Sequence, residues 1–169
     1  MKKLLTVSLI ACLLMVPIAC KVSYSFTGAD TGDAQTFQVN NFINNAPIVE
    51  PRIARELTIE LQELILNQTN LSLTDAGGDL IYEGEITQYY VSPITATAQS
   101  TAAQNRLTMA VNVRFINIKD PTKDFEQRFS FYYDYEGGAQ LVGSQLDEAL
   151  EAIYERITQD IFNASLANW

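Results

Sequence analysis

The stretch that decides the fold is Arg106–Tyr135, which reads RLTMAVNVRFINIKDPTKDFEQRFSFYYDY. Apolar and polar residues alternate through both of its halves, and this period of two places every second side chain on one face of a strand. Arg106–Ile118 and Phe125–Tyr135 are therefore predicted strands, and the turn-forming residues of Lys119–Asp124 connect them. A short turn between two strands makes them antiparallel neighbours.

Two more strands are predicted on the N-terminal side of this hairpin. Asp79–Val91 shows the same alternation directly after a Gly-Gly pair. Thr36–Phe42 reads as a shorter strand, and Asn44-Asn45-Ala46-Pro47 is a turn that ends it. Ser92–Ala103 consists largely of Ser, Thr, Ala and Gln, so it is predicted to be a long connection.

Two segments carry apolar residues at helical spacing. One opens at Pro51 and runs to about Asn67, and the other begins near Ser144 and runs to about Leu166. Ser144 and Asp147 resemble a capping box in which Asp replaces the usual Glu. Each helix has one apolar face that needs cover. We expect an α+β fold, with two helices packed on one face of a mostly antiparallel four-stranded sheet in the order β-α-β-β-β-α.

The first twenty residues predict a lipoprotein signal peptide. Lys2 and Lys3 give a positive start, an apolar stretch follows, and Ala19 precedes Cys20. The apolar run is short for a membrane-spanning helix. Leu9-Ile10-Ala11-Cys12 also fits a lipidation motif, but cleavage there would leave a very short leader, so Cys20 is preferred. A plain secreted protein with one free cysteine is the remaining alternative.

Cleavage before Cys20 divides the chain into three parts. Residues 1–19 are the removed signal peptide, residues 20–35 a lipidated N-terminal tether, and residues 36–169 one α+β domain. Lys21 follows the cysteine, with no Asp there to retain the protein in the inner membrane. The expected location is the outer membrane, lipid-anchored on the periplasmic side. With one cysteine left, the mature chain forms no internal disulfide.

The mature chain is strongly acidic. Processing removes Lys2 and Lys3 but no acidic residue, so the net charge of −9 becomes −11. This charge excludes nucleic acid as an electrostatic partner. It also disfavours a polyanionic lipid head group, unless a local basic cluster makes the contact.

The sequence contains no recognisable catalytic constellation, so the chain is not expected to be an enzyme or to hold a cofactor or metal. The chain has no histidine, which removes the commonest general base and zinc ligand. Glu83 and Glu85 share one face of a strand and could act as an acid-base pair, although a solvated strand face explains them better. Asp120, Asp124 and Glu126 lack the spacing of a dedicated calcium loop.

Two groups of residues could carry binding. Tyrosines on the second and fourth predicted strands are candidate partner-interface aromatics, with ordinary sheet packing as the alternative: Tyr82, Tyr89, Tyr90 and Tyr132. The basic residues concentrate on the last two strands and their turn, where they could contact phosphate or an acidic partner, with isolated surface charges as the alternative: Arg106, Arg114, Lys119, Lys123 and Arg128.

Several short motifs, in this order and spacing, resemble the lipopolysaccharide-assembly lipoprotein family LptE in its Bacteroidetes form. The likeness covers essentially the whole mature chain, and the family's cysteine stands just before the first of these motifs, which supports Cys20. The motifs are Tyr24-Ser25-Phe26-Thr27-Gly28-Ala29, Asn44-Asn45-Ala46-Pro47, Glu83-Gly84-Glu85-Ile86-Thr87, Asn105-Arg106-Leu107-Thr108, Arg114-Phe115-Ile116-Asn117, Lys119-Asp120-Pro121, Phe125-Glu126-Gln127, Ile161-Phe162-Asn163 and Ala167-Asn168-Trp169.

The resemblance implies a non-enzymatic role. Family members sit as a plug within the outer-membrane β-barrel protein LptD, help that barrel assemble, and assist delivery of lipopolysaccharide to the outer leaflet. The expected partners are therefore an LptD-like barrel, lipopolysaccharide, and the membrane through the N-terminal lipid. This chain departs from the family in its strongly acidic charge, and no family ligand residue can be carried over. An outer-membrane lipoprotein that binds another envelope component, or has a structural role, is the alternative.

Overall fold

The computed structural model describes residues 28–48, 50–94, 104–137 and 140–167. In chain order these residues form β1 (Thr36–Val39), β2 (Ile43–Asn44), α2 (Ile53–Gln68), β3 (Ser72–Leu73), β4 (Leu80–Ile94), β5 (Gln104–Asn117), a 3-10 turn (Pro121–Lys123), β6 (Phe125–Glu136) and α3 (Ser144–Leu166). The predicted signal peptide, Cys12, Cys20, Lys21, residues 95–103 of the predicted connection, and Trp169 lie outside the described residues.

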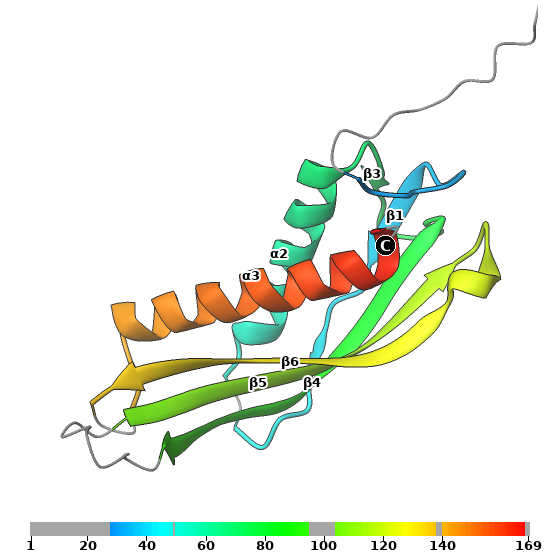
Figure 1. Cartoon of the computed structure of the whole chain (residues 1–169). Helices are drawn as coiled ribbons and strands as arrows, with labels where there is room; N and C mark the ends of the chain where they lie inside the picture. The colour runs from blue at the N-terminus through cyan, green and yellow to red at the C-terminus, as the bar shows by residue number, and fades with distance from the viewer. Residues whose placement is uncertain (1–27, 49, 95–103, 138–139, 168–169) are drawn as a thin grey trace, which may run out of the picture.

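One mixed sheet lies beneath the two helices (Figure 1). Its strand order is β3-β1-β4-β5-β6, and β2 pairs with β4 beyond the end of β1. β4, β5 and β6 form the predicted antiparallel meander, whereas β1 pairs in parallel with both β3 and β4. The prediction of four mostly antiparallel strands is therefore wrong in detail, because the sheet has six strands and its first part is parallel. The α+β class with two helices is confirmed.

Only Thr36–Val39 of the predicted strand Thr36–Phe42 forms a strand, β1, and the short β2 at Ile43–Asn44 overlaps the start of the predicted turn. The chain leaves the sheet between them, where the Phe42 amide donates to Thr58 Oγ1 on α2 at 3.0 Å and the Phe42 side chain is buried. β2 then returns to pair with Glu85 and Ile86 of β4. Anchoring Phe42 to the helix layer therefore interrupts the alternation on which the prediction rested.

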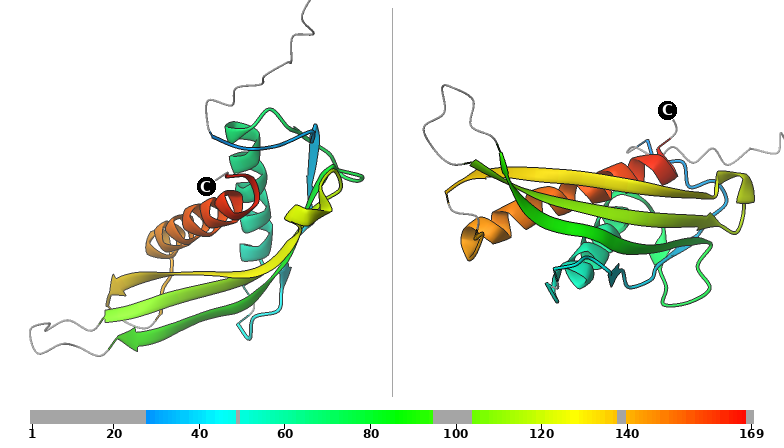
Figure 2. Two further views of the ribbon diagram at one scale, coloured as in Figure 1. Left: turned by 45° about the vertical axis from the view of Figure 1, so that its right-hand side comes forward. Right: turned by 90° about the horizontal axis from the view of Figure 1, so that it is seen from below.

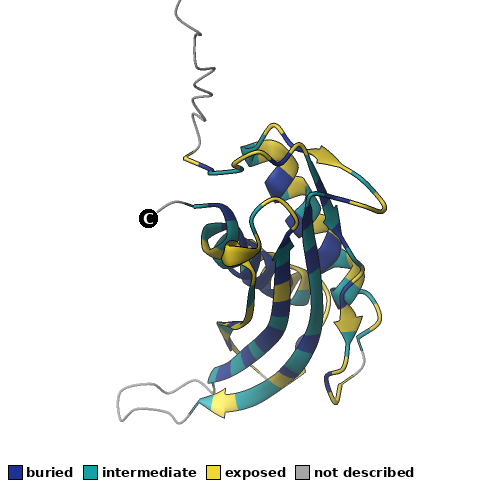
Figure 3. Cartoon of the chain, turned by 90° about the vertical axis from the view of Figure 1, so that its right-hand side faces the viewer, coloured by how far each residue is buried: buried dark blue, intermediate teal, exposed yellow. Residues whose placement is uncertain are grey.

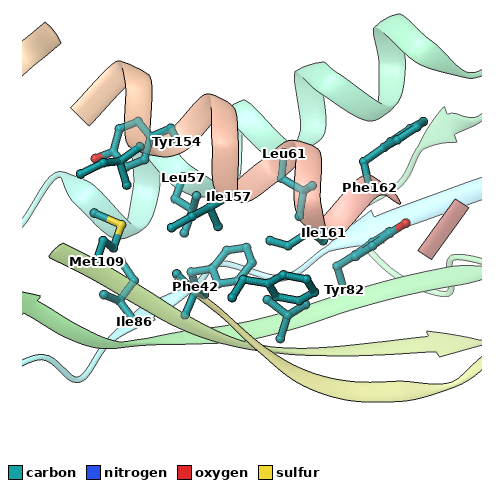
Figure 4. Packing of buried hydrophobic residues seen from close by; sticks show 14 of the residues in the cluster. Phe42, Leu57, Leu61, Tyr82, Ile86, Met109, Tyr154, Ile157, Ile161 and Phe162 are labelled. Atoms are coloured by element: carbon teal, nitrogen blue, oxygen red, sulfur yellow. The ribbon is translucent and has the colours of Figure 1, made fainter. Parts of the chain in front are cut away.

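Both helices cover the same face of the sheet, as predicted (Figure 2). α2 packs over β1, β2 and β3, and α3 packs over β5 and β6. Between the layers lie fully buried side chains such as Leu57, Leu61, Ile157 and Ile161 from the helices (Figure 4). Apolar surface removed from water in this way contributes about 25 cal/mol per Å² to folding.

Several ends of the elements differ from the sequence prediction. α2 and α3 lie within two residues of their predicted bounds, but Gly143 rather than Ser144 is the N-cap of α3 and no side-chain hydrogen bond caps it. The predicted capping box is therefore wrong. Asp147 instead forms an ion pair with Arg52, with 2.8 Å between Arg52 Nη1 and Asp147 Oδ1. This pair joins the starts of the two helices. β4 also continues through Ile94, so the predicted connection begins three residues later than Ser92.

Candidate interaction surface

The sheet face that points away from the helices is uncovered in the described part of the chain, and we call it the open face. The even-numbered residues of β5 from Arg106 to Ile116 lie on this face. Their paired residues on β4 and β6 lie on it as well. Figure 3 shows this alternation of buried and exposed positions along the long strands. A slip in register between Ile86 and Gln88 leaves Thr87 as an extra residue, so that Tyr90 stands on the open face although Tyr89 does not.

Three of the five candidate basic residues lie on the open face. Arg106 and Arg114 are on β5, and Arg128 on β6 is opposite Asn112, one diagonal step from Arg114. Arg128 donates to Gln88 Oε1 at 2.6 Å. Within the described residues Arg114 makes no ion pair, although Glu83 and Glu126 stand directly opposite it on the two neighbouring strands.

Arg106 belongs to a compact group near the far end of the open face. Its guanidinium makes two hydrogen bonds to the Asp134 carboxylate, at 2.6 and 2.8 Å, and its Cζ lies 3.6 Å from the centroid of the Tyr132 ring. These contacts hold the pKa of Asp134 below its usual value, because the guanidinium stabilises the charged carboxylate. Tyr90 and Tyr132 stand on either side of Thr108 in one row. The charges of Arg106 and Asp134 cancel, and the group consists of Arg and Tyr, two residue types that are common in interface hot spots.

Two of the four candidate tyrosines are not on the surface. Tyr82 is fully buried beneath α3, where its hydroxyl donates to Ser165 Oγ at 3.0 Å (Figure 4). Tyr89 is also buried, because the extra residue at Thr87 turns it towards the core. A buried side chain offers a partner no surface, so the prediction is wrong for these two. Tyr90 and Tyr132 are 41% and 46% exposed and remain candidates.

Lys119 and Lys123, the other two candidate basic residues, lie at the β5–β6 turn and already have acidic partners. Lys119 Nζ is 2.9 Å from Asp79 Oδ1, and Lys123 Nζ is 2.9 Å from Asp30 Oδ2. Both aspartates are more than thirty-five positions away in the sequence. The structure therefore separates the basic candidates into an arginine group on the open face and a lysine pair tied to the fold.

The Asp79 carboxylate is bound by three groups of the folded chain. It accepts hydrogen bonds from the Gln35 and Thr36 amides at 2.9 and 3.2 Å, in addition to the Lys119 contact. The Gln35 amide first, and then Lys119, lower the pKa of Asp79 from 3.8 to about 2, because both stabilise the ionised carboxylate.

This shift predicts a pH dependence of stability that is specific to Asp79. A depressed folded-state pKa contributes stability above the unfolded value of 3.8, and the contribution is lost as the pH falls through about 2. The wild type should therefore resist urea better than Asp79→Asn at pH 5, and the difference between their unfolding midpoints should shrink steadily from pH 4 to pH 2. Urea titrations at intermediate pH values check this. A difference that stays constant down to pH 2 would contradict it.

The remaining acidic candidates support local structure. Glu83 accepts from Asn40 at 3.0 Å and Glu85 from Asn45 at 2.6 Å, so each carboxylate of the possible acid-base pair holds a separate loop residue. Asp120 accepts from the Thr122 amide and hydroxyl. Across the described residues, no group of three or more metal-ligating side chains is close enough to hold an ion. None of the described helices has the length and apolar character to cross a membrane.

The chain matches one family model and is similar in fold to several solved structures. The LptE family model, described as lipopolysaccharide-assembly, matches residues 34–165. A crystal structure from Xanthomonas campestris has a TM-score of 0.52 at 11% sequence identity, over 76% of this chain and 82% of that one. A hypothetical protein from Chlamydia trachomatis has a TM-score of 0.49 at 9% identity, over 80% and 99% of the two chains. Rare lipoprotein B from Shewanella oneidensis has a TM-score of 0.41 at 16% identity, over 75% and 89%. No curated protein sequence matches the chain.

The family match covers most of the chain. It begins at the buried Ala34 just before β1 and ends at Ser165 in the last turn of α3, so it includes the whole sheet and both helix faces that cover it. The chain therefore belongs to the LptE family of lipopolysaccharide-assembly proteins.

Proposed function

We propose that the mature protein is a non-enzymatic outer-membrane lipoprotein that partners a large LptD-like β-barrel. In this role it is the plug and assembly factor of the barrel, and assists transport of lipopolysaccharide to the outer leaflet. Lipid on Cys20 holds it on the periplasmic side of the membrane. The observation that carries the proposal is the family match across residues 34–165. The open face supports it, because the exposed Tyr90 and Tyr132 lie there beside Arg106, and all three are residue types enriched at interfaces.

Affinity purification of the full chain from detergent-solubilised outer membranes tests the partnership. The expected result is one large barrel protein in stoichiometric amount. Recovery of a different envelope component would contradict the proposal and favour a lipoprotein with another binding or structural role. Mass spectrometry of the N-terminal peptide tests the anchor separately, with acyl chains expected on Cys20 rather than on Cys12.

Arg114 and Arg128 on the open face are the better candidates for contact with lipopolysaccharide phosphate. Among the described residues Arg114 forms no ion pair and Arg128 donates to the neutral Gln88 amide, so neither has to give up an acidic partner there. Arg114→Ala with Arg128→Ala should weaken binding to lipopolysaccharide aggregates by about fivefold to tenfold, as expected for two charge-assisted contacts at an exposed site.

Lys119→Gln with Lys123→Gln is the matched control for this measurement. It removes the same charge, but from side chains already engaged by Asp79 and Asp30. The control should weaken binding less than the arginine double variant does, in the same aggregate-binding titration at fixed salt. Equal losses in the two variants would show that net charge alone, and not the open face, determines the binding.

A further inference from the structure

The first described residues, Gly28–Gln35, cross the end of the domain where α3 finishes, and we call them the anchor strap. Ala29 forms an antiparallel bridge with Ala167, and the Asp30 amide donates to the Leu166 carbonyl at 2.6 Å. The strap thus satisfies a carbonyl that the last turn of α3 leaves without an intrahelical donor. In Figure 1 it is the blue segment that leads into β1.

Two lysine–aspartate ion pairs hold the ends of the anchor strap against the domain. Near its start, Asp30 Oδ2 receives Lys123 Nζ at 2.9 Å from the turn between β5 and β6. At its other end, Asp79 accepts the Gln35 amide and is itself paired with Lys119. The Lys123 ammonium and the Gly32 amide hold the pKa of Asp30 below its usual value, so the Asp30 carboxylate stays ionised at neutral pH.

The middle of the anchor strap is poorly packed. A cavity of about 470 Å³ lies between the strap and residues Thr69, Asn70 and Leu71, which connect α2 to β3. Only Ala29 and Ala34 of the strap are buried. A segment that makes few apolar contacts, and is held by exposed hydrogen bonds and ion pairs, opens at low free-energy cost.

We propose that the anchor strap is a releasable connection that sets the working length of the lipid tether. This inference rests on the proposed anchoring at Cys20 for its length scale. Ala29 is nine residues after Cys20 and Thr36 is sixteen residues after it. A fully extended chain spans about 3.4 Å per residue, so the docked strap limits the domain to within about 30 Å of its lipid, and release extends this to about 55 Å. The strap therefore determines whether the domain stays close to the membrane surface or can reach away from it.

Hydrogen exchange on the full lipidated chain in phospholipid vesicles tests the release. Lys123→Ala should raise exchange of the Asp30, Gly32 and Ala34 amides by about threefold to fivefold, the size expected for loss of one exposed ion pair. Lys123→Arg should restore the wild-type rate. Arg156→Ala is the matched control, because it breaks an ion pair of similar exposure with Asp160 on α3 and should leave the strap unchanged. Unchanged strap exchange in Lys123→Ala would overturn the proposal.

Energy transfer tests the change in reach. A donor dye on Val142→Cys, an exposed site near the start of α3, reports its separation from acceptor-labelled lipids. Lys119→Ala with Lys123→Ala should lower the transfer efficiency, because the longer tether lets the domain stand farther away. Raised strap exchange with unchanged transfer would overturn the role in tether length. An unmodified Cys20 in the mass spectrum would instead refute the proposed anchoring, and the exchange measurement would still decide whether the strap opens.

Discussion

Replacing Gly84 with valine is expected to lower the free energy of unfolding by about 3 kcal/mol, the upper part of the range for overpacking a core. Gly84 is on β4 between Tyr82 and Ile86, on the side of the sheet that faces the helices. A Cβ atom there would overlap the Phe42 ring and stand 2.9 Å from the Asn112 carbonyl oxygen. Phe42 is buried and tied to α2 through its amide, so it has little room to move away.

A double-mutant cycle in urea distinguishes this clash from a general loss of strand stability. Phe42→Ala alone should cost about 3 to 4 kcal/mol through the cavity it leaves. Combined with Gly84→Val, the cost should be smaller than the sum of the two single effects by about 1 to 3 kcal/mol, because the valine fills part of that cavity. Ser130→Val, at an exposed position of β6, is the control and should change little. Additive effects of the two single variants would contradict the proposed contact.

The sequence predicts the elements with strong periodicity and fails where the pattern is short or interrupted. β5 and β6 alternate over more than ten residues, and their bounds agree with the prediction to within two positions. β3 has only two residues, Ser72 and Leu73, which is too few to show any period. The parallel pairing of β1 with β4 depends on the crossover through α2, and alternation along a strand indicates a strand without indicating its neighbour.

The candidate site shows the same division between local and long-range information. The face of Tyr82 could be predicted, since it shares its side of β4 with Leu80 and Ile86. Tyr89 could not be placed in this way, because the extra residue at Thr87 reverses the alternation and nothing in the local sequence marks it. The partners of Lys119 and Lys123 come from distant segments, so only the folded chain shows that these lysines are occupied.

Tyr82→Ala is expected to cost about 4 kcal/mol of folding free energy, because it empties a fully buried site between β4 and α3. Burial raises the pKa of this phenol, so its hydroxyl stays protonated and donates to Ser165 at every physiological pH. Tyr82→Phe keeps the ring and loses only that hydrogen bond, so it should cost about 1 kcal/mol. Urea unfolding of the two variants measures both values.

Tyr132→Ala completes the comparison, because this ring is exposed on the open face and contacts Arg106 rather than the core. If the open face meets the barrel partner, Tyr132→Ala should reduce the amount of barrel recovered in affinity purification while shifting the unfolding midpoint only slightly. Tyr82→Phe should show the reverse, with a lower midpoint and full recovery of the barrel. The core tyrosine would then affect stability, and the open-face tyrosine would affect recovery of the barrel. If Tyr82→Phe alone reduced the amount of barrel recovered, this would contradict the placing of Tyr82 in the core and of the barrel contact at Tyr132.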